Sequence, residues 1–166
     1  MKFKSFMTMA MGAVALVLGV CSCSSDDDDE PEVPVAAQVV GTYTGDEVIT
    51  IMGEPEDDTA TFQFTKASDT SIDMIIPQSG DGGMVIPPLT VKNIPVAKVK
   101  ESIVGKLTTF AGTVTNSAGA EKAFTVSDLM VVFEDVPKGK AVVVTYVLKY
   151  GNMPFDMVTA FNGDRQ

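Results

Sequence analysis

Histidine and tryptophan are absent from the 166-residue chain, and cysteine occurs only twice. Without histidine there is no Ser-His-Asp or Cys-His nucleophile pair, and no imidazole to ligate zinc or haem. Basic side chains are also scarce, since 12 Lys and Arg face 22 Asp and Glu, for a net charge of −10. Nucleic acid is recognised through a basic footprint, so it is not an expected partner. We expect no enzymatic activity and no cofactor.

The N-terminus has the pattern of an export signal. Lys2 and Lys4 precede an apolar run over residues 6–20. A membrane-spanning helix needs about 20 apolar residues, so this run is too short to be one. A positive start followed by a short apolar core is typical of a secretory signal peptide, which is removed from the mature protein. We therefore predict a signal peptide over residues 1–22.

Both cysteines follow the apolar run directly, which is typical of bacterial lipoproteins that are acylated on a cysteine thiol. Cys23 follows Ser22, a small residue of the kind that precedes a lipidated cysteine, whereas Cys21 follows the branched Val20. We predict lipidation at Cys23, with Cys21 as the alternative. A Cys21–Cys23 disulfide is disfavoured because a single intervening residue suits disulfide geometry poorly.

A block of serine and acidic residues comes next. It resembles the export signal that directs lipoproteins of the Bacteroides group to the outer face of the outer membrane. A simpler interpretation is a solvated tether that extends a linker, and the periplasmic face of the same membrane is the alternative location. The predicted sorting signal consists of Ser24, Ser25, Asp26, Asp27, Asp28 and Asp29.

The rest of the chain alternates apolar and polar residues with a period of two, as strands do. Residues 61–65 place two phenylalanines on one face, and residues 71–76 and 141–150 follow the same rule. The residues predicted to share a face in the latter two segments are Ile72, Met74 and Ile76, and Val142, Val144, Tyr146, Leu148 and Tyr150. The prolines at 31 and 34 fix the backbone before this region and predict a stiff spacer. We predict a tether over residues 23–35 and a β domain over residues 36–166.

Turn signals separate these runs at the spacing of an antiparallel meander. The acidic stretch 53–58 is predicted to be a hairpin loop, and the segments 79–83, 116–119 and 137–140 are predicted to be turns. About eight or nine strands result, enough to close a sheet into a barrel. We predict an all-β, up-and-down antiparallel barrel of about eight strands, with a two-sheet sandwich as the alternative.

The motifs Val40-Gly41-Thr42-Tyr43-Thr44-Gly45 and Leu89-Thr90-Val91-Lys92-Asn93-Ile94-Pro95-Val96 resemble those of the calycin-like lipoproteins of Bacteroidota. In this resemblance Gly41-Thr42-Tyr43 stands where lipocalins carry Gly-x-Trp on their first strand, with tyrosine in place of tryptophan. The resemblance implies a lipocalin-type barrel and no particular activity.

Two acidic groups are candidate sites. Glu54, Glu56, Asp57 and Asp58 have oxygen ligands of the kind calcium prefers, but their spacing is not that of an EF-hand, and a solvated loop is the simpler interpretation. Glu134 and Asp135 could serve as a general acid and base only if burial raised one pKa, which a position beside a turn does not favour. We therefore expect no metal site and no catalytic residue.

Two functions remain for a lipid-anchored protein of this kind. The barrel could hold a small apolar or amphipathic ligand, which requires a cavity of roughly 300 Å³ or more. Alternatively, a barrel with a filled core could present its loops and surface to an envelope partner, which predicts an exposed apolar patch on the outside. The expected partners are thus the membrane and either a small hydrophobic ligand or an envelope protein.

Overall fold

The computed structural model describes residues 32–81, 85–136 and 139–166. A short 3-10 helix, η1 (Val35–Gln38), precedes eight strands. These strands are β1 (Gly41–Ile51), β2 (Glu54–Lys66), β3 (Ser71–Ile76), β4 (Leu89–Val99), β5 (Ser102–Thr115), β6 (Glu121–Val136), β7 (Gly139–Tyr150) and β8 (Met157–Arg165).

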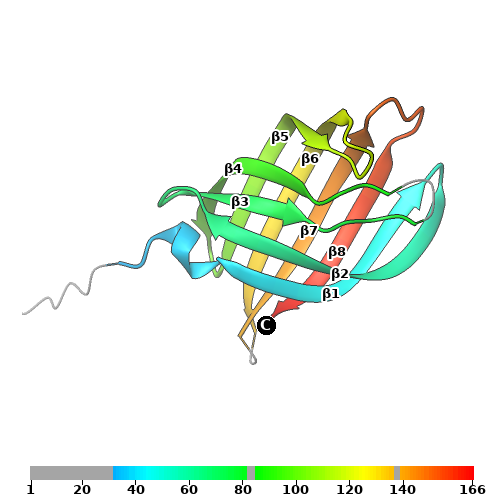
Figure 1. Cartoon of the computed structure of the whole chain (residues 1–166). Helices are drawn as coiled ribbons and strands as arrows, with labels where there is room; N and C mark the ends of the chain where they lie inside the picture. The colour runs from blue at the N-terminus through cyan, green and yellow to red at the C-terminus, as the bar shows by residue number, and fades with distance from the viewer. Residues whose placement is uncertain (1–31, 82–84, 137–138) are drawn as a thin grey trace, which may run out of the picture. The chain divides into compact units, whose positions relative to one another are not determined.

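The eight strands form one closed antiparallel barrel in which each strand pairs with its neighbours in sequence (Figure 1). β1 closes the barrel by pairing with β8 over residues 43–51 and 157–165. The predicted all-β, up-and-down fold is confirmed, and the two-sheet sandwich is not what forms. Closure satisfies the backbone groups that would otherwise be exposed along the first and last strands.

The alternation in sequence becomes the inner and outer faces of the barrel. In β7 the predicted inward set is buried, and the residues between its members are more exposed. Strands β2, β3 and β8 follow the same rule, as side chains of period two must when one face of a sheet is covered. The inward set of β7 comprises Val142, Val144, Tyr146, Leu148 and Tyr150.

Aromatic rings fill the barrel from wall to wall. Phe64 on β2 and Phe133 on β6 lie four strands apart around the barrel, yet their ring centroids are 5.0 Å apart. The ring of Tyr43 packs against both, at 5.5 Å and 5.6 Å. Phe62 and Phe161 stack at 4.4 Å in the adjacent layer. Strands on opposite walls are thus joined by direct ring contacts, and no ligand-sized space is left at this level.

The N-terminal helix covers the end of the barrel where β1 begins. Ala36 and Val39 are fully buried, and the Ala36 N–H donates to the carbonyl of Asp69 in the β2–β3 turn. The Tyr43 hydroxyl donates to the Val39 carbonyl over 3.1 Å. Tyr43 therefore takes part in closing this end of the barrel.

The predicted acidic loop over residues 53–58 is wrong. β1 continues to Ile51 and β2 begins at Glu54, so the connection is the two-residue turn Met52-Gly53. Both turn residues have positive φ, 54° and 89°, as the tight hairpin turn that suits strand twist requires. The acidic residues extend β2 because strand pairing uses the backbone, and their exposed side chains remain in water.

Three strands change their inward register part-way along, at two places in the barrel wall. In β4 the buried positions switch from Leu89 and Val91 to Ile94 and Val96, at a bulge where Asn93 has a φ of 57°. The Asp73 carboxylate accepts the Asn93 N–H at 2.8 Å and holds this bulge. An extra residue in one strand bends it and increases its twist.

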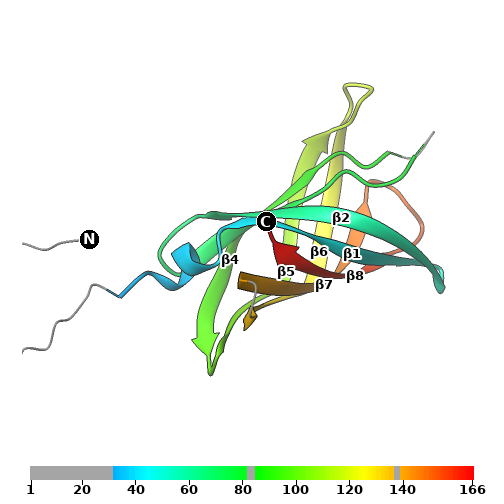
Figure 2. The same cartoon turned by 90° about the horizontal axis from the view of Figure 1, so that it is seen from below.

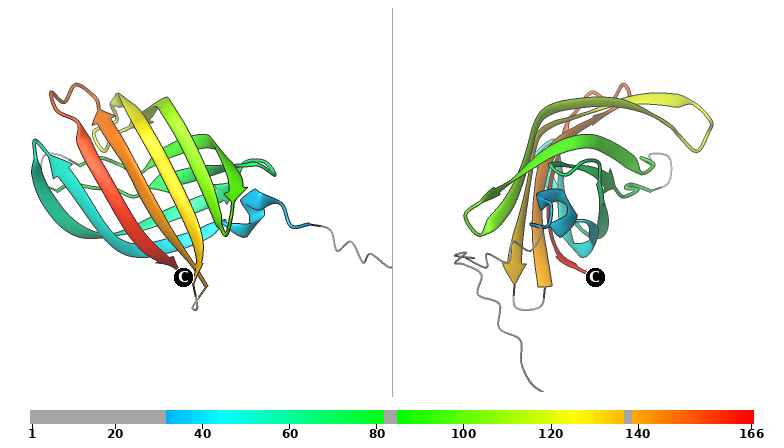
Figure 3. Two further views of the ribbon diagram at one scale, coloured as in Figure 1. Left: turned by 180° about the vertical axis from the view of Figure 1, so that it is seen from behind. Right: turned by 90° about the vertical axis from the view of Figure 1, so that its left-hand side faces the viewer.

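The second switch lies in β6 and is shared by β5. The register of β6 with β7 shifts between Ser127 and Met130, and Asp128 has a φ of 52°. On β5 the inward positions change between Leu107 and Phe110. The far half of the β5–β6 hairpin consequently bends away from the rest of the wall, as the right-hand view of Figure 3 shows.

These bends open a seam between β4 and β5. The two strands pair only over Val96–Val99 and Ser102–Gly105, although each is at least 11 residues long. Beyond this short ladder the strands diverge, and a hollow of about 370 Å³ lies between Thr90 and Lys92 on one side and Phe110 and Gly112 on the other. Figure 2 shows the hairpin of β5 and β6 projecting beyond the neighbouring strands.

Candidate functional site

The predicted lipidation and sorting residues lie outside the part of the chain that the structure describes. Cys23, its alternative Cys21, and the block from Ser24 to Asp29 all precede Glu32, where the described chain begins. They remain predictions from sequence. The described chain begins beside η1, at the end of the barrel that carries the β2–β3 turn.

Below the mouth of the barrel lies a buried polar layer that sequence reasoning missed. Glu47 on β1 is 4% exposed, and Tyr146 and Thr159, which face each other across β7 and β8, are also buried. Burial, reinforced by the charge of Asp58 opposite it on β2, raises the pKa of Glu47 to about 7. Burial and the nearby Glu47 raise the pKa of Tyr146, while a hydrogen bond with Thr159 opposes that shift.

The signal for Glu47 was present in the sequence. Inward positions on β1 recur every second residue from Tyr43, and Glu47 is in phase with them. An acidic residue at an inward position of a strand is a candidate for a raised pKa. Its chemistry at neutral pH is that of a group divided between its acid and its carboxylate, inside an otherwise apolar interior.

The acidic start of β2 lines a pocket at the barrel mouth. Glu56, Asp57 and Asp58 border a space of about 340 Å³ together with Ile49 and residues 79–81 of the β3–β4 connection. Among residues 32–81, 85–136 and 139–166, no group of three or more acidic side chains converges in the manner of metal ligands. The acidic side chains of β2 are exposed, which fits the solvated interpretation of this stretch.

Glu134 and Asp135 do not form an acid–base pair. Both are exposed near the end of β6, and Asp135 accepts a hydrogen bond from Lys140 of β7 at 2.6 Å. This hydrogen bond and the lysine charge lower the pKa of Asp135. A general acid requires the opposite shift, because it must hold a proton near neutral pH.

Apolar side chains gather on the outer wall of the barrel. Register pairs Ala97 with Val104, Val104 with Val132, and Val132 with Val143, so that these four side chains form a row across β4 to β7. We call this set the outer apolar row. Val143 is 41% exposed, and Val99 and Met130 beside the row are 51% and 38% exposed. Outward positions of a solvated barrel are ordinarily polar.

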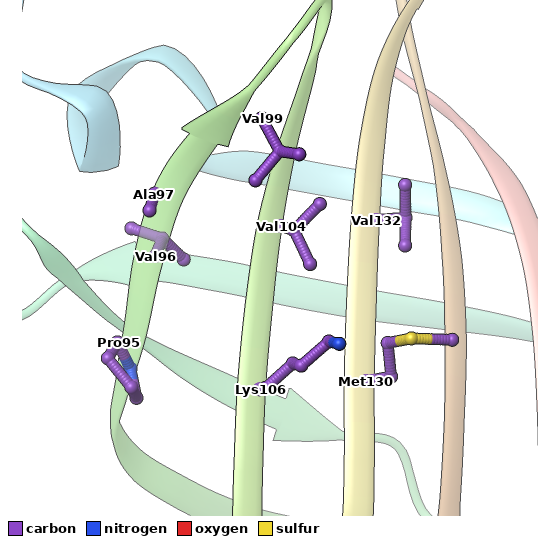
Figure 4. A pocket seen from close by; sticks show the side chains of 8 residues that line it. All are labelled: Pro95, Val96, Ala97, Val99, Val104, Lys106, Met130 and Val132. Atoms are coloured by element: carbon purple, nitrogen blue, oxygen red, sulfur yellow. The ribbon is translucent and has the colours of Figure 1, made fainter.

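Part of the outer apolar row is hollowed. A depression of about 540 Å³ lies over β4, β5 and β6. Figure 4 shows the side chains that line it, which are valines, Ala97, Met130 and Pro95, with Lys106 the charged residue among them. Patches of this kind on a folded protein mark contact surfaces more often than chance exposure does. This is the exposed apolar patch that the filled-core interpretation predicts, since Phe64 and Phe133 fill the interior.

Comparison with known proteins shows the fold alone. No family model and no curated protein matches the chain, so the calycin-like resemblance remains a prediction from its motifs. Within the described residues, no helix is both long and apolar enough to cross a membrane. A solved structure from Bacteroides fragilis, of a protein provisionally named an outer membrane protein, superimposes with a TM-score of 0.58 at 17% sequence identity. The match covers 80% of this chain, which spans about half (53%) of the length of that protein.

Proposed function

We propose that the chain is a lipoprotein of the outer membrane, anchored through Cys23, whose barrel serves as an interaction module for an envelope partner. The proposal assigns binding rather than catalysis. The observation that carries it is the combination of a filled interior, with Phe64 against Phe133 at 5.0 Å, and an apolar outer row. A barrel packed with rings has no room at that level for a small ligand, whereas its outer wall offers surface that a partner would remove from water.

The anchor and location rest on sequence and on the structural likeness. The apolar run followed by Cys23 and an acidic block supports lipidation and export. The likeness to a Bacteroides fragilis protein provisionally placed in the outer membrane supports an envelope location. Two or more acyl chains on one cysteine would anchor the protein stably, because each buried CH₂ contributes about 0.8 kcal/mol. We include exposure at the cell surface in the proposal, with the periplasmic face as the alternative.

The outer apolar row is tested by one charge placed within it. In solubilised membranes the wild-type protein should migrate with its partner as part of a larger assembly, and Val143→Glu should reduce it to the size of the protein without that partner. Val143 is partly exposed, so the substitution places a carboxylate in the contact without entering the core.

Gln63→Glu provides the matched control, because Gln63 is an exposed outward residue on β2, on another wall of the barrel. This variant should remain in the assembly. If the wild type migrates without a partner, or if Val143→Glu and Gln63→Glu behave alike, the outer apolar row is not the contact surface.

A further inference from the structure

The seam leaves one edge of β5 without a strand partner. From Lys106 to Thr115 this strand pairs with β6, while its other side faces the hollow between it and β4. Backbone groups along such an edge must bond to water or to another chain. This edge is distinct from the outer apolar row, which crosses β5 at Val104.

The turn at the tip of the hairpin determines which backbone groups are free. The Asn116 N–H donates to the Ala120 carbonyl at 2.9 Å, so these two residues form a hydrogen-bonded pair. Such pairs alternate along an antiparallel ladder. Gly112 therefore directs its N–H and C=O to β6, whereas Ala111 and Thr113 direct theirs to the open seam.

Nothing in the sequence of this edge protects it from pairing. Natural sheets block exposed edges with lysine, proline or very short strands. The stretch Leu107–Thr115 contains no charged residue and no proline, and threonine, valine and phenylalanine favour strands. An uncharged, strand-forming edge nine residues long is a template for another strand.

The edge is also close to symmetric about Gly112. When two copies of Thr109–Thr115 run antiparallel with Gly112 on the two-fold axis, Thr109 meets Thr115 and Phe110 meets Val114. An aromatic residue opposite a β-branched one is a favourable cross-strand pair, as are two threonines. Ala111 meets Thr113, and these are the residues whose backbone groups are free.

We propose that β5 pairs with β5 of a second copy of this chain, antiparallel and centred on Gly112, which joins two barrels through one continuous sheet. Gly112 suits the axis because it has no side chain, and a Cβ there would lie 2.7 Å from the Phe124 ring. The half-buried Phe110 and Val114 would each be covered by the other copy.

Charge favours contact between two copies at this edge over contact between them at other faces. The body from Val33 onward carries a net charge of −6, so two copies repel each other over most orientations. The edge itself carries no charge, and the charged residue that lines the hollow beside it is Lys92 of β4. A two-fold contact of one surface with itself is moreover the commonest way in which soluble proteins dimerise.

The register is tested by disulfide crosslinking of the whole protein in its own cells. Two tagged forms are co-expressed, one carrying Ala111→Cys and the other Thr113→Cys, and the cells are oxidised with copper phenanthroline. Hydrogen-bonded pairs have Cα atoms about 5.5 Å apart, within the range that a disulfide spans. We expect a crosslinked heterodimer. The control combines Ala111→Cys with Lys106→Cys, an exposed position seven residues from Thr113, the partner of Ala111 in the proposed register.

Absence of the product between positions 111 and 113, or an equal yield from the control combination, would overturn the proposal. A second measurement uses the sedimentation mass of the detergent-solubilised protein. Thr113→Pro removes a free-edge N–H at a site where strands tolerate proline, and Thr113→Lys brings two like charges together near the axis. Both variants should halve the mass of the dimeric wild type.

Thr125→Lys is the matched control, since Thr125 lies opposite Ala111 on β6, away from the edge. It should sediment as a dimer. A wild type that is monomeric at every concentration, a dimer that persists in both Thr113 variants, or a different polypeptide bound to the edge would each contradict pairing with a second copy. Thermal unfolding followed by circular dichroism verifies that every variant is folded.

Discussion

Glu47 is an acidic residue buried in the middle of a barrel that is otherwise packed with apolar side chains. Removing a carboxylate from water favours its protonated form, and the charge of Asp58 acts in the same direction. The pKa of Glu47 in the folded protein, about 7, therefore lies above its ordinary value of 4.5. Folding stability must depend on pH wherever the two values differ.

The sign of this dependence follows from the direction of the shift. Below pH 4.5 Glu47 is protonated in both states and costs the fold nothing. Between pH 4.5 and 7 the unfolded chain releases this proton while the folded protein retains it, so the free energy of unfolding should fall over that interval by on the order of 3 kcal/mol. Glu47→Gln should remove this decline and raise the unfolding temperature at pH 8 by several degrees.

The control variant is Glu56→Gln, because Glu56 is an exposed acid on the neighbouring strand. The measurement is urea unfolding of the wild type, Glu47→Gln and Glu56→Gln at pH 5 and pH 8. Glu56→Gln should retain the wild-type decline between the two pH values. An equal decline in Glu47→Gln would show that Glu47 is not the group responsible.

At the scale of strands, two glycines permit the closure of the barrel. Gly45 on β1 lies directly opposite Gly163 on β8. A Cβ on Gly45 would lie 2.1 Å from the backbone oxygen of Asn162 and 2.4 Å from the Gly163 Cα. Backbone atoms cannot move aside as the end of a flexible side chain can, so the two strands would have to separate.

Gly45→Ala should therefore destabilise the fold by roughly 2 kcal/mol or more, since forced overpacking costs about 1–3 kcal/mol. Asp46→Ala, at the neighbouring exposed position, should change stability by less than about 0.5 kcal/mol. Chemical denaturation of both variants tests this. If Gly45→Ala were as stable as Asp46→Ala, the close approach of β1 and β8 would not constrain closure.

The strands themselves could largely be predicted from sequence, because alternation of apolar and polar residues is local information. This succeeded for β7 and β3, whose inward residues were identified correctly. It failed at residues 53–58, where acidic composition was interpreted as a loop although strand pairing uses only the backbone. It could not detect the bulges at Asn93 and Asp128, since a change of inward register looks like a weakening of the pattern.

At the scale of the whole molecule, the features that carry function arise from contacts between distant parts of the chain. The ring contact between Phe64 and Phe133 and the seam between β4 and β5 depend on pairing across the barrel, which no local pattern reports. The sequence allowed two alternatives, a hollow barrel that holds a ligand and a filled barrel with an apolar patch on its outside. Only the packing decides between a filled and a hollow interior.

The anchor is a prediction for the whole molecule. Cys23→Ser should abolish incorporation of radiolabelled palmitate and release the protein from the membrane fraction, whereas Cys21→Ser should leave both unchanged. The physical reason is that the acyl chains on one thiol supply the membrane affinity of the protein. The reverse pattern would move lipidation to Cys21, and labelling of neither form would contradict the lipoprotein interpretation.

Surface exposure is measured separately by treating intact cells with protease. Loss of the wild-type protein is expected, with a periplasmic protein as the control that survives. Survival of the lipidated protein would place it on the periplasmic face of the outer membrane.

The central claim is that this barrel acts through its outside, because rings such as Phe64 and Phe133 occupy its interior. The most direct test is native mass spectrometry of the protein purified from its own cells, combined with solvent extraction of the same sample. We predict masses equal to one or two polypeptides with their acyl chains and nothing further, and no small molecule in stoichiometric amount in the extract. An apolar compound bound at one per chain and released only on unfolding would contradict the account.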